Sequence, residues 1–197
     1  MLKSASLIIT ASSRLWPVSS FVARRNIRTM APENTTHEAR TALDELDSDG
    51  SFKRTDSVWR SWVSNEEGSR FKPEKDRYHL YVAYACPWAH RTLITRALKG
   101  LEDVISVTVA MPVWQRTKPD DSNDVHAGWM FADEDAEPFH NSNGLGGPFP
   151  SSYPGTNEPD PYLGAKSIRE VYERVGDTGG KYSVPILYDK KLKTIVK

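Results

Sequence analysis

The chain has a single cysteine, and this scarcity limits the chemistry open to it. Among 197 residues, Cys86 stands alone. It therefore cannot form a disulfide within the chain, contribute to a structural zinc site built on cysteine pairs, or enter a two-cysteine redox cycle. Any thiol–disulfide chemistry at Cys86 must take its second thiol from a small molecule or from another protein.

Long apolar runs and an excess of one charge are also lacking. The best apolar candidate, Leu7-Ile8-Ile9, is far shorter than the ~20 residues that span a bilayer, so we expect no membrane association. The 26 Lys and Arg balance the 26 Asp and Glu, which leaves no electrostatic argument for nucleic acid or an acidic membrane. A small-molecule substrate or a protein partner fits this composition better.

Acidic side chains are absent from residues 1–30. That segment is basic and rich in serine, with Lys3, Arg14, Arg24, Arg25, Arg28, Ser4, Ser6, Ser12, Ser13, Ser19 and Ser20. Such a composition is typical of a mitochondrial transit peptide, and the alternative is a disordered basic tail. We therefore expect a mitochondrial protein. Met30 offers an alternative start, which would give a cytoplasmic form.

The composition changes after Met30. Residues 31–57 are polar and acidic, and we expect them to form a linker with little power to build a core. Val58 and Trp59 then supply apolar anchors. The remaining chain, residues 58–197, has the length of one domain.

A strand, a helix and a second strand open this domain. Residues 78–85 are aromatic and β-branched, as in a buried strand. Pro87 suits the first position of a helix, apolar residues then recur with helical spacing, and Gly100 marks the end. Residues 104–111 alternate as a second strand. The connection implies a right-handed crossover and parallel pairing.

The second half of the domain follows a long insertion. Residues 112–165 are rich in proline and glycine and predict an irregular surface segment. An amphipathic helix is expected over 165–175, followed by strands over 184–188 and 194–196 that form a hairpin. This order predicts an α/β thioredoxin-like fold that stops before its last helix.

Cys86 lies between the first strand and the helix, in Ala85-Cys86-Pro87-Trp88-Ala89-His90-Arg91. The first turn of a helix has unpaired N–H groups and a partial positive charge, which stabilise a thiolate. Because the thiolate is the nucleophile, this position favours a reactive cysteine over a structural one. His90 lies one helical turn further on, and we expect it to be structural.

Pro185 opens the third strand, directly after Ser183 and Val184. In a thioredoxin-like fold this proline is cis and faces the cysteine, and the preceding residue offers its backbone to a bound peptide as an added strand would. The alternative is an ordinary trans proline at a strand edge.

These stretches together resemble one family, the glutathionyl-hydroquinone reductases. These are the Xi class of glutathione transferases and relatives of the Omega class. The resemblance covers residues 52–197 and rests on the Cys86 motif with its flanks, on Gly128-Trp129-Met130-Phe131, and on the segments 182–191 and 194–196.

The resemblance implies a catalytic cycle with glutathione as co-substrate. Cys86 would attack the sulfur of a glutathionyl-hydroquinone and release the hydroquinone. The resulting mixed disulfide between Cys86 and glutathione would then be resolved by a second glutathione. One cysteine is enough for such a cycle, because the second thiol comes from outside.

Four further residues are implied in glutathione binding by their matching positions: Trp129, Arg169, Val184 and Pro185. Trp129 would pack against or bond glutathione, and Val184 would offer its backbone beside Pro185. Arg169 would pair with a glutathione carboxylate. The other interpretations are loop packing for Trp129 and a solvated charge for Arg169. No histidine has the spacing of a metal site, so we expect no metal.

The family pattern continues beyond the last strand of this chain. A Glu-Ser pair there grips glutathione, and an all-helical domain helps to form the hydroquinone pocket and a dimer. We expect this chain to lack that C-terminal domain, which puts its dimerisation in question. The alternative function is therefore a non-catalytic glutathione-transferase-like module with a binding role.

Overall fold

The computed structural model describes residues 39, 42–140, 147–150 and 158–197. The predicted transit segment, residues 1–30, and the first part of the predicted linker lie outside these residues. Within the described part of the chain, no helix has the length and apolar character needed to cross a membrane.

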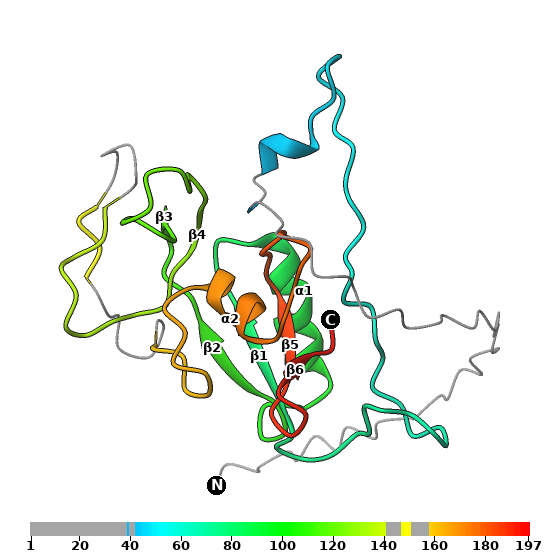
Figure 1. The fold of residues 1–197 in the computed structure, drawn as a ribbon. Coiled ribbons are helices and arrows are strands. Elements are labelled where there is room, and N and C mark those ends of the chain that lie inside the picture. Colours follow the sequence, from blue (N-terminus) through cyan, green and yellow to red (C-terminus); the bar gives the residue numbers. More distant parts are fainter. Residues whose placement is uncertain (1–38, 40–41, 141–146, 151–157) are drawn as a thin grey trace, which may run out of the picture. The chain divides into compact units, whose positions relative to one another are not determined.

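Four strands form the main sheet in the order β2-β1-β5-β6 (Figure 1). β1 (Tyr78–Val82) pairs in parallel with β2 (Ser106–Val109), and α1 (Pro87–Leu98) connects the two. On its other side β1 pairs antiparallel with β5 (Ile186–Asp189), which in turn pairs antiparallel with β6 (Thr194–Ile195). The predicted order of strand, helix, strand, insertion, helix and two strands is confirmed.

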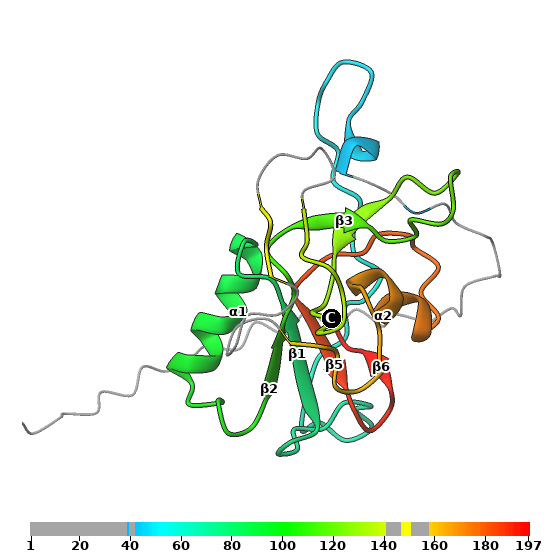
Figure 2. The ribbon, with the colours of Figure 1, turned by 90° about the vertical axis from the view of Figure 1, so that its left-hand side faces the viewer.

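Helices cover both faces of this sheet, as Figure 2 shows for α1 on one side and α2 (Ile168–Arg174) on the other. Side chains along β1 alternate between the faces. Leu80 and Val82 pack with Ala89 of α1 in one buried cluster. Tyr81 belongs to the cluster on the other face, which includes side chains of α2 and β5. Each β1 residue is therefore buried, whichever face it occupies.

The first strand and the second helix are among the elements that are shorter than the sequence predicts, each for a local reason. The first strand ends at Val82, because the chain turns there and the Cys86 N–H donates to the Ala83 carbonyl at 3.0 Å. The helix expected over 165–175 begins at Ile168. Ser167 is its N-cap, and its hydroxyl accepts the Glu170 N–H at 3.2 Å.

The insertion contains a hairpin that the sequence does not reveal. β3 (Trp114–Arg116) pairs antiparallel with β4 (Ala127–Trp129), and Trp114 lies opposite Trp129. Each strand has three residues, too few for an alternating pattern to show. The expectation of an irregular segment over 112–165 is therefore wrong for these two short strands.

The predicted linker is attached to the domain through specific contacts. A short 3-10 helix, η1 (Ala42–Glu45), ends at Glu45, whose side chain is buried. The Glu45 carboxylate accepts the Thr55 N–H at 2.8 Å and forms an ion pair with Lys181. Lys181 precedes β5, so this part of the chain is held against the loop that leads to Pro185. Its polar side chains are used for contacts that composition alone does not predict.

Candidate active site around Cys86

Cys86 is the N-cap residue of α1, and its sulfur is not used to cap the helix. The backbone is extended there, with φ −95° and ψ 113°, and Pro87 follows at the first helical position. The Cys86 carbonyl accepts the Ala89 and His90 N–H groups at 3.1 and 3.3 Å, which starts the helix. The thiol is half-buried and makes no side-chain bond to the helix. It lies at the N-terminal end of α1, where the helix dipole is positive.

The peptide bond between Val184 and Pro185 is cis, as the sequence predicts. The Cys86 S–H donates to the Val184 carbonyl, with the sulfur 3.6 Å from the oxygen. Within the described part of the chain, the Val184 N–H donates to no group. This backbone segment thus faces the thiol and offers a free donor to an extended ligand.

The peptide ahead of Val184 is fixed from α2. The Tyr172 hydroxyl donates to the Ser183 carbonyl at 2.9 Å. Burial raises the pKa of Tyr172, so the hydroxyl keeps the proton that it donates. Together with the cis bond, this contact sets the direction in which Val184 meets Cys86.

Trp129 borders the same core cluster as Cys86. It lies in β4 and is half-buried, and both side chains pack against the cluster that contains Val184. Its ring meets Trp114 edge to face, with centroids 5.5 Å apart. The structure therefore brings Cys86, Val184 and Pro185 together, and places Trp129 against the same core cluster.

Arg169 is engaged with other protein groups. Its guanidinium pairs with Asp124 at 2.6 Å and with Glu173 at 2.8 Å, and it is almost fully buried. The hydrogen bond from Arg169 lowers the pKa of Asp124. This ion pair joins α2 to the loop between β3 and β4. The role of Arg169 toward a glutathione carboxylate stays a prediction, and the carboxylates it meets here are the protein's own.

Residues near Cys86 that the sequence analysis did not single out include Tyr84 and two arginines. The Tyr84 carbonyl lies 2.6 Å from Nε2 of His90, so this histidine bonds to the backbone, in line with a structural role. The guanidinium groups of Arg54 and Arg91 lie over the ring of Trp88. Residues three apart on a helix share a face, so the spacing of Trp88 and Arg91 could have suggested their contact.

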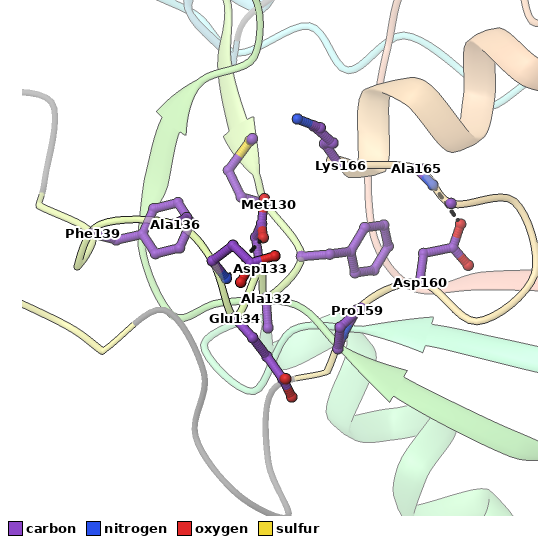
Figure 3. A pocket seen from close by; sticks show the side chains of 13 residues that line it. Met130, Ala132, Asp133, Glu134, Ala136, Phe139, Pro159, Asp160, Ala165 and Lys166 are labelled. Atoms are coloured by element: carbon purple, nitrogen blue, oxygen red, sulfur yellow. Dashed lines mark hydrogen bonds between the residues drawn. The ribbon is translucent and has the colours of Figure 1, made fainter.

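A cavity of about 490 Å³ lies elsewhere, beside the insertion (Figure 3). It is lined by the segment from Met130 to Ala136 and by the turn around Asp160 and Lys166, and it includes neither Cys86 nor Val184. In Figure 3 the Asp160 carboxylate points to the Ala165 N–H, which it accepts at 2.9 Å. Among the described residues, no three His, Cys, Asp or Glu side chains are grouped as a metal site requires.

Comparison with known proteins agrees with this geometry. The model for "Glutathione S-transferase, N-terminal domain" matches residues 85–196. "Glutathione S-transferase omega-like 2" of Schizosaccharomyces pombe is 41% identical over 152 residues, which cover 75% of this chain and 38% of that protein. "Glutathionyl-hydroquinone reductase YqjG" of Escherichia coli is 35% identical over 162 residues, covering 79% and 41%.

Solved structures give the same result. The glutathione-S-transferase Xi from Phanerochaete chrysosporium superposes with a TM-score of 0.57 at 41% identity and covers 77% of this chain and 40% of that one. The chain thus spans about two fifths of the length of the relatives it matches. The predicted thioredoxin-like fold is confirmed, and the chain belongs to the glutathione S-transferase family, among homologues that are Xi-class transferases and glutathionyl-hydroquinone reductases.

Proposed function

We propose that this protein is a glutathione-dependent oxidoreductase that reduces glutathionyl-hydroquinones, with Cys86 as the nucleophile. The observation that carries the proposal is the position of the thiol. Cys86 caps α1, and its sulfur lies 3.6 Å from the carbonyl of Val184, directly before the cis bond to Pro185. Two relatives are named as reductases of this kind, in Escherichia coli and in Sphingobium chlorophenolicum.

Glutathione would bind as an added strand along Val184. Its cysteinyl C=O can accept the free Val184 N–H, which places its sulfur near Cys86. Trp129, half-buried at the border of the same cluster, would cover the bound tripeptide. Glutathione-bound structures of the Escherichia coli and Saccharomyces cerevisiae relatives support this choice of ligand.

The reaction then runs in two steps. The Cys86 thiolate attacks the sulfur of the conjugate, the bond between that sulfur and the aromatic carbon breaks, and the carbon takes up a proton to give the hydroquinone. A disulfide between Cys86 and glutathione remains. A second glutathione thiolate attacks the glutathionyl sulfur, releases the Cys86 thiolate and leaves as glutathione disulfide.

A reduction assay with glutathionyl-menadiol tests this function. The wild-type chain should release menadiol and form glutathione disulfide in equal amounts, and Cys86→Ser should abolish both products. His90→Gln is the matched control, because His90 lies one helical turn further along α1 and its Nε2 contacts the backbone carbonyl of Tyr84. If the wild type and Cys86→Ser behave alike, Cys86 is not the nucleophile.

A further inference from the structure

Two arginines converge on the exposed ring of Trp88, which follows Cys86 by two residues on α1. The guanidinium carbon of Arg91 lies 4.2 Å from the ring centroid of Trp88, and that of Arg54 lies 5.1 Å from it. Trp88 is 49% exposed, so solvent and ligands can reach this group. Both guanidinium groups carry a positive charge at this ring, so an anion bound there would be attracted to both.

Neither arginine has a carboxylate partner among the described residues. Three acidic side chains near Arg54 in the sequence are paired with other cations: Glu45 with Lys181, Asp47 with Lys53, and Asp56 with Arg60. Other arginines of this domain are paired with carboxylates, such as Arg77 with Asp189 at 2.6 Å. Arg54 and Arg91 therefore keep their charge available.

Arg54 is held in place through its backbone neighbours. The Lys53 N–H donates to the Glu45 carbonyl at 2.7 Å, and the Thr55 N–H donates to the Glu45 carboxylate at 2.8 Å. The Lys181 ammonium closes the arrangement by donating to the Thr55 carbonyl at 3.2 Å. Although burial opposes it, the hydrogen bonds from Lys181 and Thr55 lower the pKa of Glu45, so the anchor stays charged.

Arg91 is held by the helix. Trp88 and Arg91 are three residues apart on α1 and share a face, and Trp88 follows Cys86 by two residues. Lys181, on the other side, precedes Val184 by three residues. The segment that carries Arg54 thus contacts both chain segments that form the thiol site.

We propose that Arg54, Trp88 and Arg91 form an anion subsite next to Cys86, which binds a carboxylate or similar anionic group of the molecule that reacts with the thiol. This rests on the proposed function only in taking Cys86 as the reacting thiol. The anionic group has two possible sources: a carboxylate of glutathione, or an acidic group on the aromatic part of the substrate.

The reaction of Cys86 with two aromatic disulfides tests the subsite on the full chain. Dithiobis-nitrobenzoate carries a carboxylate on each ring, whereas dithiodipyridine carries no charge. In both, the Cys86 thiolate attacks one sulfur, the S–S bond breaks, and an aromatic thiolate leaves while a mixed disulfide forms. With one cysteine in the sequence, each chain releases one thiolate.

Arg54→Gln and Arg91→Gln should each slow the reaction with dithiobis-nitrobenzoate about two- to fivefold, as expected for one exposed charge pair. Neither should slow the reaction with dithiodipyridine, which also shows that the variants are folded. Added salt should reduce the advantage of the anionic reagent in the wild type. Arg70→Gln is the matched control, because Arg70 lies 5.2 Å over Phe71, near the opposite end of β1 from Cys86.

The subsite is refuted if Arg54→Gln and Arg91→Gln change both reagents equally or neither, or if Arg70→Gln has the same effect as they do. A parallel measurement with glutathione disulfide identifies the source of the anion. If both variants also react more slowly with glutathione disulfide, the subsite binds a glutathione carboxylate. If only the reaction with dithiobis-nitrobenzoate is slower, the subsite binds an acidic group on the aromatic part of the substrate. A third outcome is that the wild-type chain fails to reduce glutathionyl-menadiol while the arginine variants still react more slowly only with dithiobis-nitrobenzoate. That outcome would support the subsite and reject the proposed reductase function.

Discussion

At the scale of single residues, burial decides what each polar group can do. Cys86 is half-buried and faces a backbone carbonyl, so its sulfur stays accessible to an extended ligand. His79, in the middle of the sheet, shows the opposite case. It is 1% exposed, its Nδ1 lies 2.7 Å from the Ser106 hydroxyl, and its Nε2 has no partner among the described residues. Such a ring is held neutral and contributes to packing.

His79 should make the fold sensitive to acid. Burial, reinforced by the charge of Lys190, lowers the pKa of His79 to about 4, against an ordinary value of 6.5. The unfolded chain therefore binds a proton at a higher pH than the folded chain. The stability that His79 contributes is complete above pH ~6.5 and is lost as the pH falls toward ~4.

Denaturant unfolding of the wild type at pH ~7 and ~5 measures this effect. We expect the free energy of unfolding to fall by about 2 kcal/mol more in the wild type than in His79→Gln, which does not titrate. His140→Gln, at the surface-exposed edge of the insertion, is the control and should follow the wild type. Equal losses in the wild type and in His79→Gln would contradict a buried, neutral His79.

At the scale of elements, local sequence patterns predicted helices and strands well, but they did not predict which distant segments pair with each other. The apolar spacing of α1 and the β-branched run of β2 follow from neighbouring residues, and both elements lie close to the expected positions. The ion pair between Arg169 and Asp124 joins residues 45 positions apart, and no local pattern encodes it. The hairpin of β3 and β4 was missed for a similar reason, since its strands are short and its register places Trp114 opposite Trp129, 15 positions further along the chain.

Asp160 fixes the return of the insertion to the sheet. Its carboxylate accepts the Tyr81 hydroxyl at 2.6 Å and the N–H groups of Tyr162, Leu163 and Ala165 at 3.1, 3.0 and 2.9 Å. Asp160→Ala leaves these donors without an acceptor in a buried place, so we expect a loss of about 3 kcal/mol in the free energy of unfolding.

Thermal and denaturant unfolding check this value, with Asp135→Ala as the control. Asp135 lies in the same insertion, and its side chain is exposed. Tyr81→Phe removes one of the four hydrogen bonds and should cost about 1 kcal/mol. An Asp160→Ala variant as stable as Asp135→Ala would show that the turn is held by packing alone.

At the scale of the whole molecule, the polar lead-in is attached to the domain by specific contacts. The sequence predicts a linker over 31–57, because composition reports average polarity and not specific pairing. The described part of that segment places Glu45 in a buried ion pair with Lys181, and Arg54 over Trp88. The candidate site thus includes residues from the lead-in, from α1 and from the loop before β5. Of these residues, the sequence analysis had singled out Cys86, Val184 and Pro185.

The chain spans about two fifths of its relatives, so the most direct test uses the step that depends on Cys86 alone. The chain is mixed with glutathionyl-menadiol without free glutathione, and its intact mass and the released menadiol are measured together. The account predicts one glutathionyl group on each chain, one menadiol released per chain, and neither product with Cys86→Ser. Menadiol release without the mass increase, or an unmodified wild-type chain beside unreacted conjugate, would contradict Cys86 as the nucleophile.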